Sequence, residues 1–172
     1  MGRSKKIDWV SFVVFGFLVL SIVMAIVGVC IAWTSSSVTS VIGKTESTTS
    51  TLGDWAKLHE NASKVSDGGL EGFAAMQAFA YITLALTALT TVLFVVSKFI
   101  NVKFFRFLVM ASAALLIISA IVCISLCFNF CGKYEVDAGV AATEVVPAAG
   151  AWLLTVFSVL GGGAGIVGAV KK

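Results

Sequence analysis

Four long apolar runs decide what this chain can fold into. They cover residues 9–32, 73–97, 104–128 and 148–170, and apart from Arg106 near the start of the third run they contain no acidic or basic side chain. At about 1.5 Å of rise per residue, a helix over any of these runs is longer than the roughly 30 Å hydrocarbon layer of a bilayer. We therefore expect an all-α membrane protein, a four-transmembrane-helix bundle in which residues 1–172 form one domain.

Composition supports the same class. Only 12% of the residues are charged and the mean hydropathy is +1.03, whereas a soluble domain has about 25% charged residues. The first run could be the apolar core of a secretory signal, but such cores are about 7–15 residues long and this run is longer. We interpret all four runs as membrane helices.

The distribution of charge predicts the orientation. If both termini and the loop 98–103 lie on one side, that side has a net charge of +7 when Arg106 is included, and the other side, loops 33–72 and 129–147, has −4. An excess of Lys and Arg marks the cytoplasmic side of a membrane protein. We therefore expect both termini to be cytoplasmic and the two larger loops to be extracellular. The sequon at Asn61 lies in the first outer loop, so Asn61 is a candidate for N-glycosylation, and the plasma membrane is favoured over an organelle.

The first outer loop is unusually polar for so apolar a chain. Of residues 34–51, 12 are Ser or Thr. Its segment SVTSVI has weak strand character, so the loop can contain a small sheet, but it can equally be a flexible or O-glycosylated segment. The following LGDWAKLHENASKV is typical of a short helix with Asp54 as N-cap. The loop is thus expected to form a small β and helical cap.

The four tryptophans divide into two groups. Trp9, Trp33 and Trp152 lie near the ends of predicted spans, where the amphipathic indole ring favours the membrane–water boundary, so we interpret them as interface anchors. Trp55 lies in the middle of the loop and needs either a fold or a partner to cover it. We expect Trp55 and Leu58 to form a partner-facing part of the cap.

Small and hydroxylated residues recur at helical spacing in two of the spans. In the fourth span this small-residue set consists of Gly161, Gly165, Gly168 and Ala169, which allow close helix packing, either inside the bundle or, less favoured, against a partner. In the second span Thr83, Thr87 and Thr91 recur every four residues. They are typical of interhelical hydrogen bonding, and a pore lining is the alternative.

Chemistry has few candidate residues. Cys30, Cys127 and Cys131 fall at the predicted outer ends of their helices, where a disulfide from Cys30 to one of the other two is possible, and buried free thiols are the alternative. The single histidine, His59, has only Glu60 beside it, which is weak support for catalysis. We expect no enzyme activity, no metal or cofactor, no nucleic-acid partner and no small-molecule substrate.

The sequence resembles the claudin-like tetraspan superfamily, which includes claudins, peripheral myelin proteins and amastins. The residues that carry the resemblance are Trp33 after the first run, LGDW at 52–55, AAMQAFAYITLAL opening the second span and GAWLLTVFSVLGGG in the fourth. Members of the family usually have cysteines in the first outer loop, and this loop has none. The resemblance implies a left-handed four-helix bundle with a folded first loop.

These observations favour a non-enzymatic tetraspan protein that acts by lateral or cell-surface association, in a structural, adhesive or scaffolding role. Its expected partners are the lipid bilayer, copies of itself and other membrane proteins. The first alternative is an accessory subunit of a larger membrane complex, such as an organellar assembly or a channel. The second is a subunit of an oligomeric pore.

Overall fold

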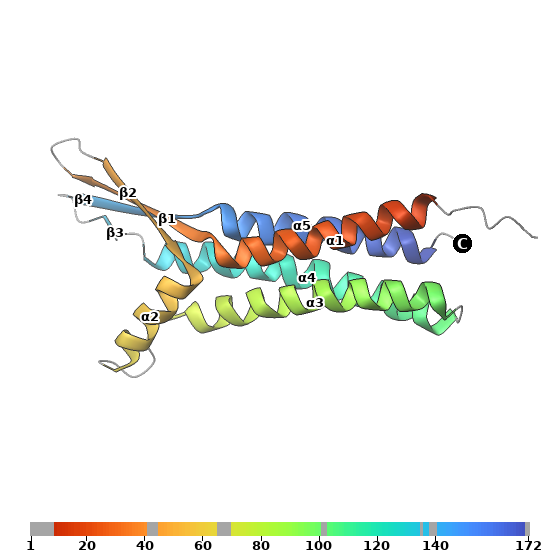
Figure 1. Cartoon of the computed structure of the whole chain (residues 1–172). Coiled ribbons are helices and arrows are strands. Elements are labelled where there is room, and N and C mark those ends of the chain that lie inside the picture. The colour runs from red at the N-terminus through yellow and green to blue at the C-terminus, as the bar shows by residue number, and fades with distance from the viewer. Residues whose placement is uncertain are drawn as a thin grey trace, which may run out of the picture.

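The computed structural model describes residues 9–40, 45–64, 70–100, 103–134, 136–137 and 141–170. Within these residues the chain forms five helices and four strands, in the order α1 (Trp9–Cys30), β1 (Ala32–Ser40), β2 (Thr45–Thr51), α2 (Leu52–Ser63), α3 (Phe73–Phe99), α4 (Lys103–Lys133), β3 (Val136–Asp137), β4 (Ala141–Pro147) and α5 (Ala149–Val170). The chain is mostly helical, with one small sheet (Figure 1).

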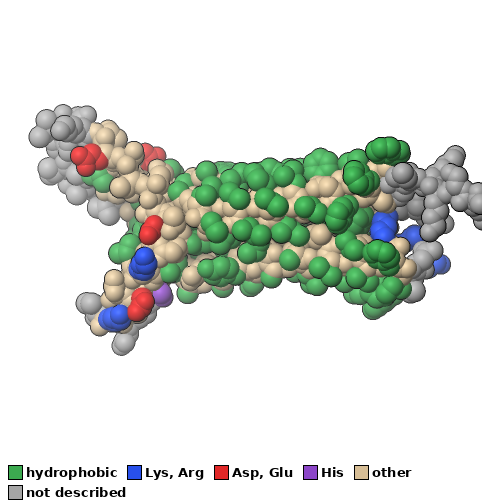
Figure 2. All heavy atoms as spheres, viewed as in Figure 1, with side chains coloured by type: hydrophobic (Ala, Val, Ile, Leu, Met, Phe, Trp, Pro, Cys, Tyr) green, Lys and Arg blue, Asp and Glu red, His purple; other side chains and the backbone are tan. Residues whose placement is uncertain are grey.

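Four of the five helices, α1, α3, α4 and α5, are long and apolar enough to cross a membrane. This confirms the four predicted spans and marks the chain as an integral, multi-pass membrane protein. The four helices lie side by side in one bundle, and apolar side chains cover its middle in the view of Figure 2. Charged side chains are gathered at the two ends of the bundle.

Neighbours in the bundle follow the ring α1, α5, α4, α3. The pairs α1 with α5, α5 with α4 and α4 with α3 pack closely, and the pair α1 with α3 closes the ring through far fewer contacts. Helices α1 and α4 are diagonal and hardly touch. The seam between α1 and α3 is therefore the most open side of the bundle.

The helix ends differ from the predicted ones because of tertiary packing. Helix α4 continues to Lys133, five residues past the predicted end at 128, since Phe130 and Cys131 are buried under the residues of loop 1. Helix α1 ends at Cys30 because Ala32 already pairs in the sheet. Hydropathy alone cannot place such boundaries, because it does not show which residues the loops bury.

The sheet is built from both large loops. Its strand order is β2, β1, β4, β3, and every neighbouring pair is antiparallel. The Ser- and Thr-rich segment thus forms the paired strands β1 and β2, which favours the sheet over the flexible alternative. β-Branched threonine suits a strand, and its polar hydroxyl is compatible with a sheet that is exposed to water on both faces.

The sheet and α2, here called the cap, lie together at one end of the bundle (Figure 1). Strand β1 follows α1 after one residue, and β4 leads into α5 through Ala148. The first and last described residues, Trp9 and Val170, lie at the opposite end, here called the terminal end. The basic residues of the sequence outside 9–170 lie outside the described residues.

The small-residue set of α5 packs inside the bundle. A Cβ added to Gly161 would lie 2.6 Å from the hydroxyl of Ser21, and one added to Gly168 would lie 2.5 Å from the ring of Phe94. A Cβ added to Gly165 would lie 3.2 Å from Thr90 of α3 and 3.3 Å from Ala113 of α4, both tight contacts, and Ala169 is buried. These residues therefore serve helix packing within one chain, the favoured of the two alternatives.

Candidate functional site

The joint between the cap and the bundle is organised around Trp33. Its side chain is 0% exposed, and its indole Nε1 donates a hydrogen bond of 2.7 Å to the carbonyl oxygen of Gly28. The prediction that Trp33 is an interface anchor is wrong, because the ring is enclosed by the chain itself. Trp9 and Trp152, at opposite ends of the bundle, are 70% and 47% exposed, and their role as interface anchors stays a prediction.

The hydrogen bond from Trp33 supplies a partner for a carbonyl at the end of α1. The last four carbonyls of a helix have no partner within the helix. In α1 the carbonyl of Val27 accepts from the Ile31 amide, and the next one, Gly28, accepts from the Trp33 indole. The backbone carbonyl of Trp33 in turn accepts from the amide of Ala148 at 2.8 Å. One residue thus closes α1 and ties it to the start of α5.

Two glycines make this joint sterically possible. A Cβ on Gly150 would lie 2.6 Å from the Gly28 carbonyl oxygen and 2.7 Å from that of Ala32. A Cβ on Gly28 would lie 2.9 Å from the Gly150 carbonyl oxygen. Because the obstacles are backbone atoms, no side-chain rotation can relieve them. The α1 and α5 backbones therefore cross at a point that only glycine allows.

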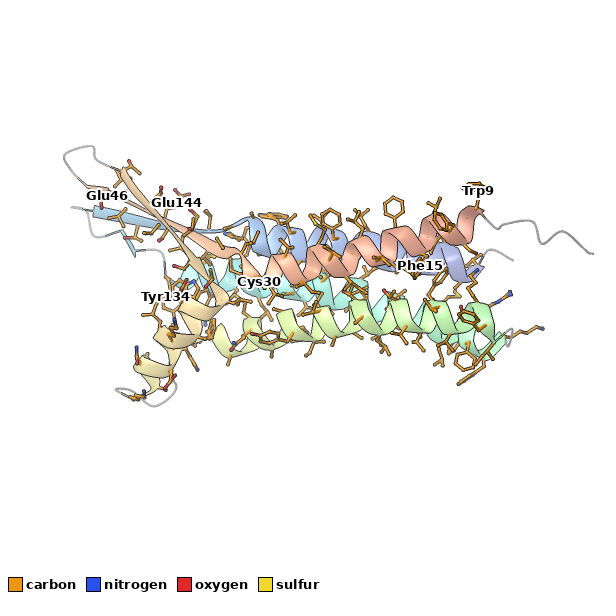
Figure 3. The ribbon with its side chains drawn as sticks, in the orientation of Figure 1. Trp9, Phe15, Cys30, Glu46, Tyr134 and Glu144 are labelled. Carbon is orange, nitrogen blue, oxygen red and sulfur yellow. The ribbon has the colours of Figure 1, made fainter. Side chains whose placement is uncertain are left out.

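Trp55 connects α2 to the same joint. Its Nε1 donates a 2.7 Å hydrogen bond to the Thr34 hydroxyl, and its ring packs edge-on against Phe130 of α4 at 4.9 Å between centroids. Tyr134, visible below the sheet in Figure 3, packs against Phe130 at 4.7 Å. The chain's own fold covers much of Trp55, while Leu58 is 51% exposed. Of the predicted partner-facing pair, Leu58 alone is largely open to a partner.

The start of α2 is fixed by a capping box, and its N-cap lies three residues earlier than predicted. Thr51, and not Asp54, is the N-cap: its hydroxyl accepts from the Asp54 amide at 3.2 Å. The Asp54 carboxylate accepts from the Thr51 amide at 3.0 Å and from its hydroxyl at 2.8 Å. These bonds hold the pKa of Asp54 below its ordinary value, and the bond from the Thr51 amide contributes most.

The far end of α2 is tied to α3. His59 accepts a hydrogen bond of 2.9 Å at Nδ1 from the Leu70 amide, and its ring lies 5.4 Å from that of Phe73. Glu71 pairs with Lys133 at the end of α4, and this hydrogen bond lowers the pKa of Glu71. Glu60 pairs with Lys64 instead of His59. The histidine is thus used to hold the cap.

No disulfide joins these cysteines. Cys30, labelled in Figure 3, is exposed on α1, whereas Cys127 and Cys131 are buried on α4. The prediction of a bridge from Cys30 is wrong because α1 and α4 are diagonal in the bundle and hardly touch. The buried thiols pack with Phe73 and Met76 as small apolar groups. Across the described part of the chain, no three His, Cys, Asp or Glu side chains form a possible metal site.

The threonines of α3 are buried inside the single bundle. Thr83 shares a 2.8 Å hydrogen bond with Ser119 of α4, and Thr87 lies 3.4 Å from the hydroxyl of Ser158 in α5. Each also donates to a carbonyl one turn back. This is the interhelical bonding that the spacing predicts, and it leaves these hydroxyls inside the bundle, away from any pore between copies. Thr90 differs: among the described atoms its buried hydroxyl has no partner.

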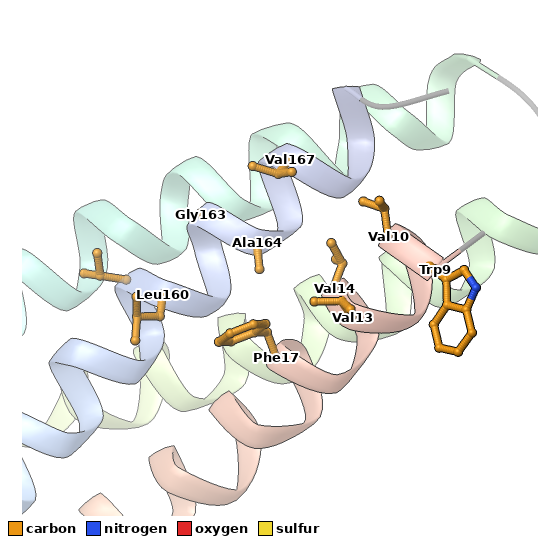
Figure 4. Close-up of a pocket in the computed structure, with 10 residues that line it drawn as sticks. Trp9, Val10, Val13, Val14, Phe17, Leu160, Gly163, Ala164 and Val167 are labelled. Carbon is orange, nitrogen blue, oxygen red and sulfur yellow. The ribbon is translucent and has the colours of Figure 1, made fainter. Parts of the chain in front are cut away.

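Two apolar grooves mark the lipid-facing surface. The larger, of about 530 Å³, lies between α1 and α5 and is lined by Trp9, Val13, Phe17, Leu160 and Val167 among others (Figure 4). Gly163 lies on its wall, and a Cβ there would meet nothing within 4 Å. The smaller, of about 310 Å³, lies between α1 and α3 and includes one charged side chain, Lys98.

No protein-family model matches the chain, and a search of curated proteins finds no relative. Function must therefore be argued from the geometry. Sequence reasoning missed the joint formed by Trp33, Gly28 and Gly150. The one local signal of this joint is a tryptophan shortly after an apolar run. An exposed interface anchor gives the same signal, so only the packing of α5 distinguishes a buried Trp33 from an anchor.

Proposed function

We propose that this protein is a non-enzymatic integral membrane protein that acts by protein–protein association through its cap. The observation that carries the proposal is the outer edge of the sheet. Strand β2 has β1 on one side and, among the described strands, none on the other. Its first five residues are exposed, and a free strand edge offers backbone donors and acceptors to a further strand.

The anchoring of the cap supports this proposal. Trp33, Trp55 and His59 fix the sheet and α2 to the bundle by directional hydrogen bonds. A surface that is held rigidly before binding loses less conformational entropy when it binds. Glu46 lies on the edge strand β2 (Figure 3), and a charged side chain on an edge strand disfavours random pairing with other edges. The expected partner is therefore a specific protein segment.

The proposal includes an orientation. Every described acidic residue lies in the cap or, in the case of Glu71, between α2 and α3, and Lys98, Lys103 and Arg106 lie at the terminal end. This distribution supports an extracellular cap and cytoplasmic termini under the positive-inside rule. Asn61 is exposed on α2. At the plasma membrane, endoglycosidase should reduce the apparent mass of the native protein, and Asn61→Gln should abolish that change. A wild-type protein without the change would favour an organelle.

The claudin-like resemblance belongs to the same proposal. Four spans, strands from both large loops, a short loop helix and Trp33 after the first span support it. The absence of cysteine from residues 33–72 is a departure that the chain offsets with the bonds of Trp33 and Trp55. A left-handed bundle and a structural, adhesive or scaffolding role follow from the resemblance.

The association is tested by placing a photo-crosslinking residue at Thr48 on β2 and, as a matched control, at exposed Lys57 on α2. Irradiation of native membranes should give one adduct of defined mass from position 48 and none from position 57. An adduct of twice the chain mass identifies a second copy, and another mass identifies a different membrane protein. Equal labelling from both positions, or none from position 48, would contradict association through the β2 edge.

A further inference from the structure

The groove between α1 and α3 combines an apolar wall with a cation. Ser11, Phe12 and Phe15 line it from α1, and Phe94, Val95, Lys98 and Phe99 line it from α3. It lies towards the terminal end of the bundle, on the seam where the ring of helices is most open. Phe12 and Phe99 are largely exposed, so their rings meet lipid rather than protein in a single copy.

The apolar part of the groove suits an acyl chain. An apolar cavity holds water poorly because a water molecule needs two to four polar partners. The groove opens towards the hydrocarbon layer, and the aromatic rings provide broad flat walls for dispersion contacts. A lipid tail is therefore its natural filling.

The charged part of the groove, Lys98, favours one kind of lipid headgroup. The Lys98 ammonium lies 5.1 Å from the centroid of the Phe94 ring, so the side chain folds over the groove. Both ion pairs formed between described residues lie at the cap end of the bundle, and neither involves Lys98. Every described Asp and Glu belongs to the cap or its attachment to α3, so no described carboxylate neutralises the terminal end. This excess of positive charge complements a negative headgroup.

From these observations we propose that the α1–α3 groove binds a phospholipid with an anionic headgroup. The acyl chain lies between the phenylalanine rings, and the net negative charge of the headgroup is balanced by the Lys98 ammonium. The proposal is independent of the association through the cap, because it concerns the opposite end of the bundle. The larger α1–α5 groove has no charged lining residue, so it should accept acyl chains without regard to the headgroup.

The test uses the full chain in nanodiscs of phosphatidylcholine mixed with phosphatidylserine. After release into the gas phase, native mass spectrometry should find phosphatidylserine retained in preference to phosphatidylcholine. Lys98→Gln should lower that preference about fivefold, and Lys98→Arg should keep it. Lys103→Gln is the matched control, since Lys103 is exposed at the same end but does not line the groove.

A second measurement separates the site from general surface charge. Phosphatidylserine with a photoreactive acyl chain should label peptides containing Phe12 or Phe15, and Lys98→Gln should reduce this label while leaving labelling of the α1–α5 groove unchanged. Equal losses in Lys98→Gln and Lys103→Gln would overturn the proposal, because they would indicate a diffuse surface effect. Equal retention of both lipids by the wild type would overturn it as well.

Discussion

The two ends of the bundle are held in different ways. At the cap end, directional contacts converge: the indole of Trp33 on Gly28, the indole of Trp55 on Thr34, and the backbone crossing of Gly28 with Gly150. At the terminal end, the described residues show exposed aromatic rings and two open grooves. The protein itself therefore fixes the end that carries the cap and leaves the other end to be completed by lipid.

The largest effect should come from closing the glycine crossing. Gly150→Ala places a methyl group 2.6 Å from one carbonyl oxygen and 2.7 Å from another, both on backbone that cannot move aside. We expect a loss of about 3 kcal/mol or more in the free energy of unfolding, measured by thermal or denaturant unfolding in detergent micelles. Gly163→Ala, on the same helix but with nothing within 4 Å, should be tolerated. Equal stability of the two variants would remove the contrast between the two ends.

A smaller loss is expected at the indole of Trp33. Trp33→Phe keeps a ring but removes the donor to the Gly28 carbonyl, which is then buried without this partner. Leaving a buried acceptor unsatisfied lowers stability by about 1–3 kcal/mol. Trp152→Phe is the control, because Trp152 is half exposed and its ring packs against Phe128 without an indole hydrogen bond among the described contacts. Equal losses in the two variants would contradict a stabilising role for the hydrogen bond from Trp33 to Gly28.

The middle of the bundle allows a finer comparison between two threonines. Thr87→Val removes a hydroxyl that donates to the Thr83 carbonyl and lies near Ser158, so a loss of about 0.6 kcal/mol is expected. Thr90→Val removes a buried hydroxyl that has no partner among the described atoms. The second variant should be neutral or more stable, since valine has nearly the same shape and no polar atom to desolvate. A larger loss for Thr90→Val would show that its hydroxyl is bonded in the membrane.

The smallest effect should be confined to α2. Because the pKa of Asp54 is lowered in the folded chain, its carboxylate stabilises α2 at neutral pH, and this contribution is lost as the pH falls through the folded pKa. Amide hydrogen exchange in α2 should accelerate on acidification in the wild type and should depend less on pH in Asp54→Asn. The bundle amides should be unaffected in both proteins. A pH response that extends into α3 would mean that α2 and the bundle open together.

Much of the architecture could be predicted because it depends on local composition. Long apolar runs predict membrane helices wherever their partners lie, and the amphipathic segment around Trp55 predicts a helix without further information. The N-cap was misplaced by three residues because Thr51 and Asp54 are both good caps, and their reciprocal bonding decides between them. Local chemistry thus predicted which elements exist better than where they begin.

The candidate site could be predicted only in part, since it depends on which helices are neighbours. The sequence could not show that α1 and α4 are diagonal, so a bridge from Cys30 to Cys127 looked as reasonable as free thiols. Trp33 likewise fits a membrane boundary until α5 is packed over it. Pairing of β1 with β4 joins residues that are more than a hundred positions apart, and no local pattern encodes that register.

The continuity of strands and helices has a mechanical consequence. Since β1 extends α1 and β4 extends α5, a pull on the sheet is transmitted as tension along two membrane helices at once. Their backbones meet at Gly28 and Gly150 just below the paired strands, so this crossing is the point about which α1 and α5 can rotate. A partner that pulls on the cap would rotate the two helices about that point, and the ends of the helices furthest from it would move most. The groove beside Lys98 lies at that far end of α1, where a small rotation about the Gly28–Gly150 crossing gives the largest displacement of the helix.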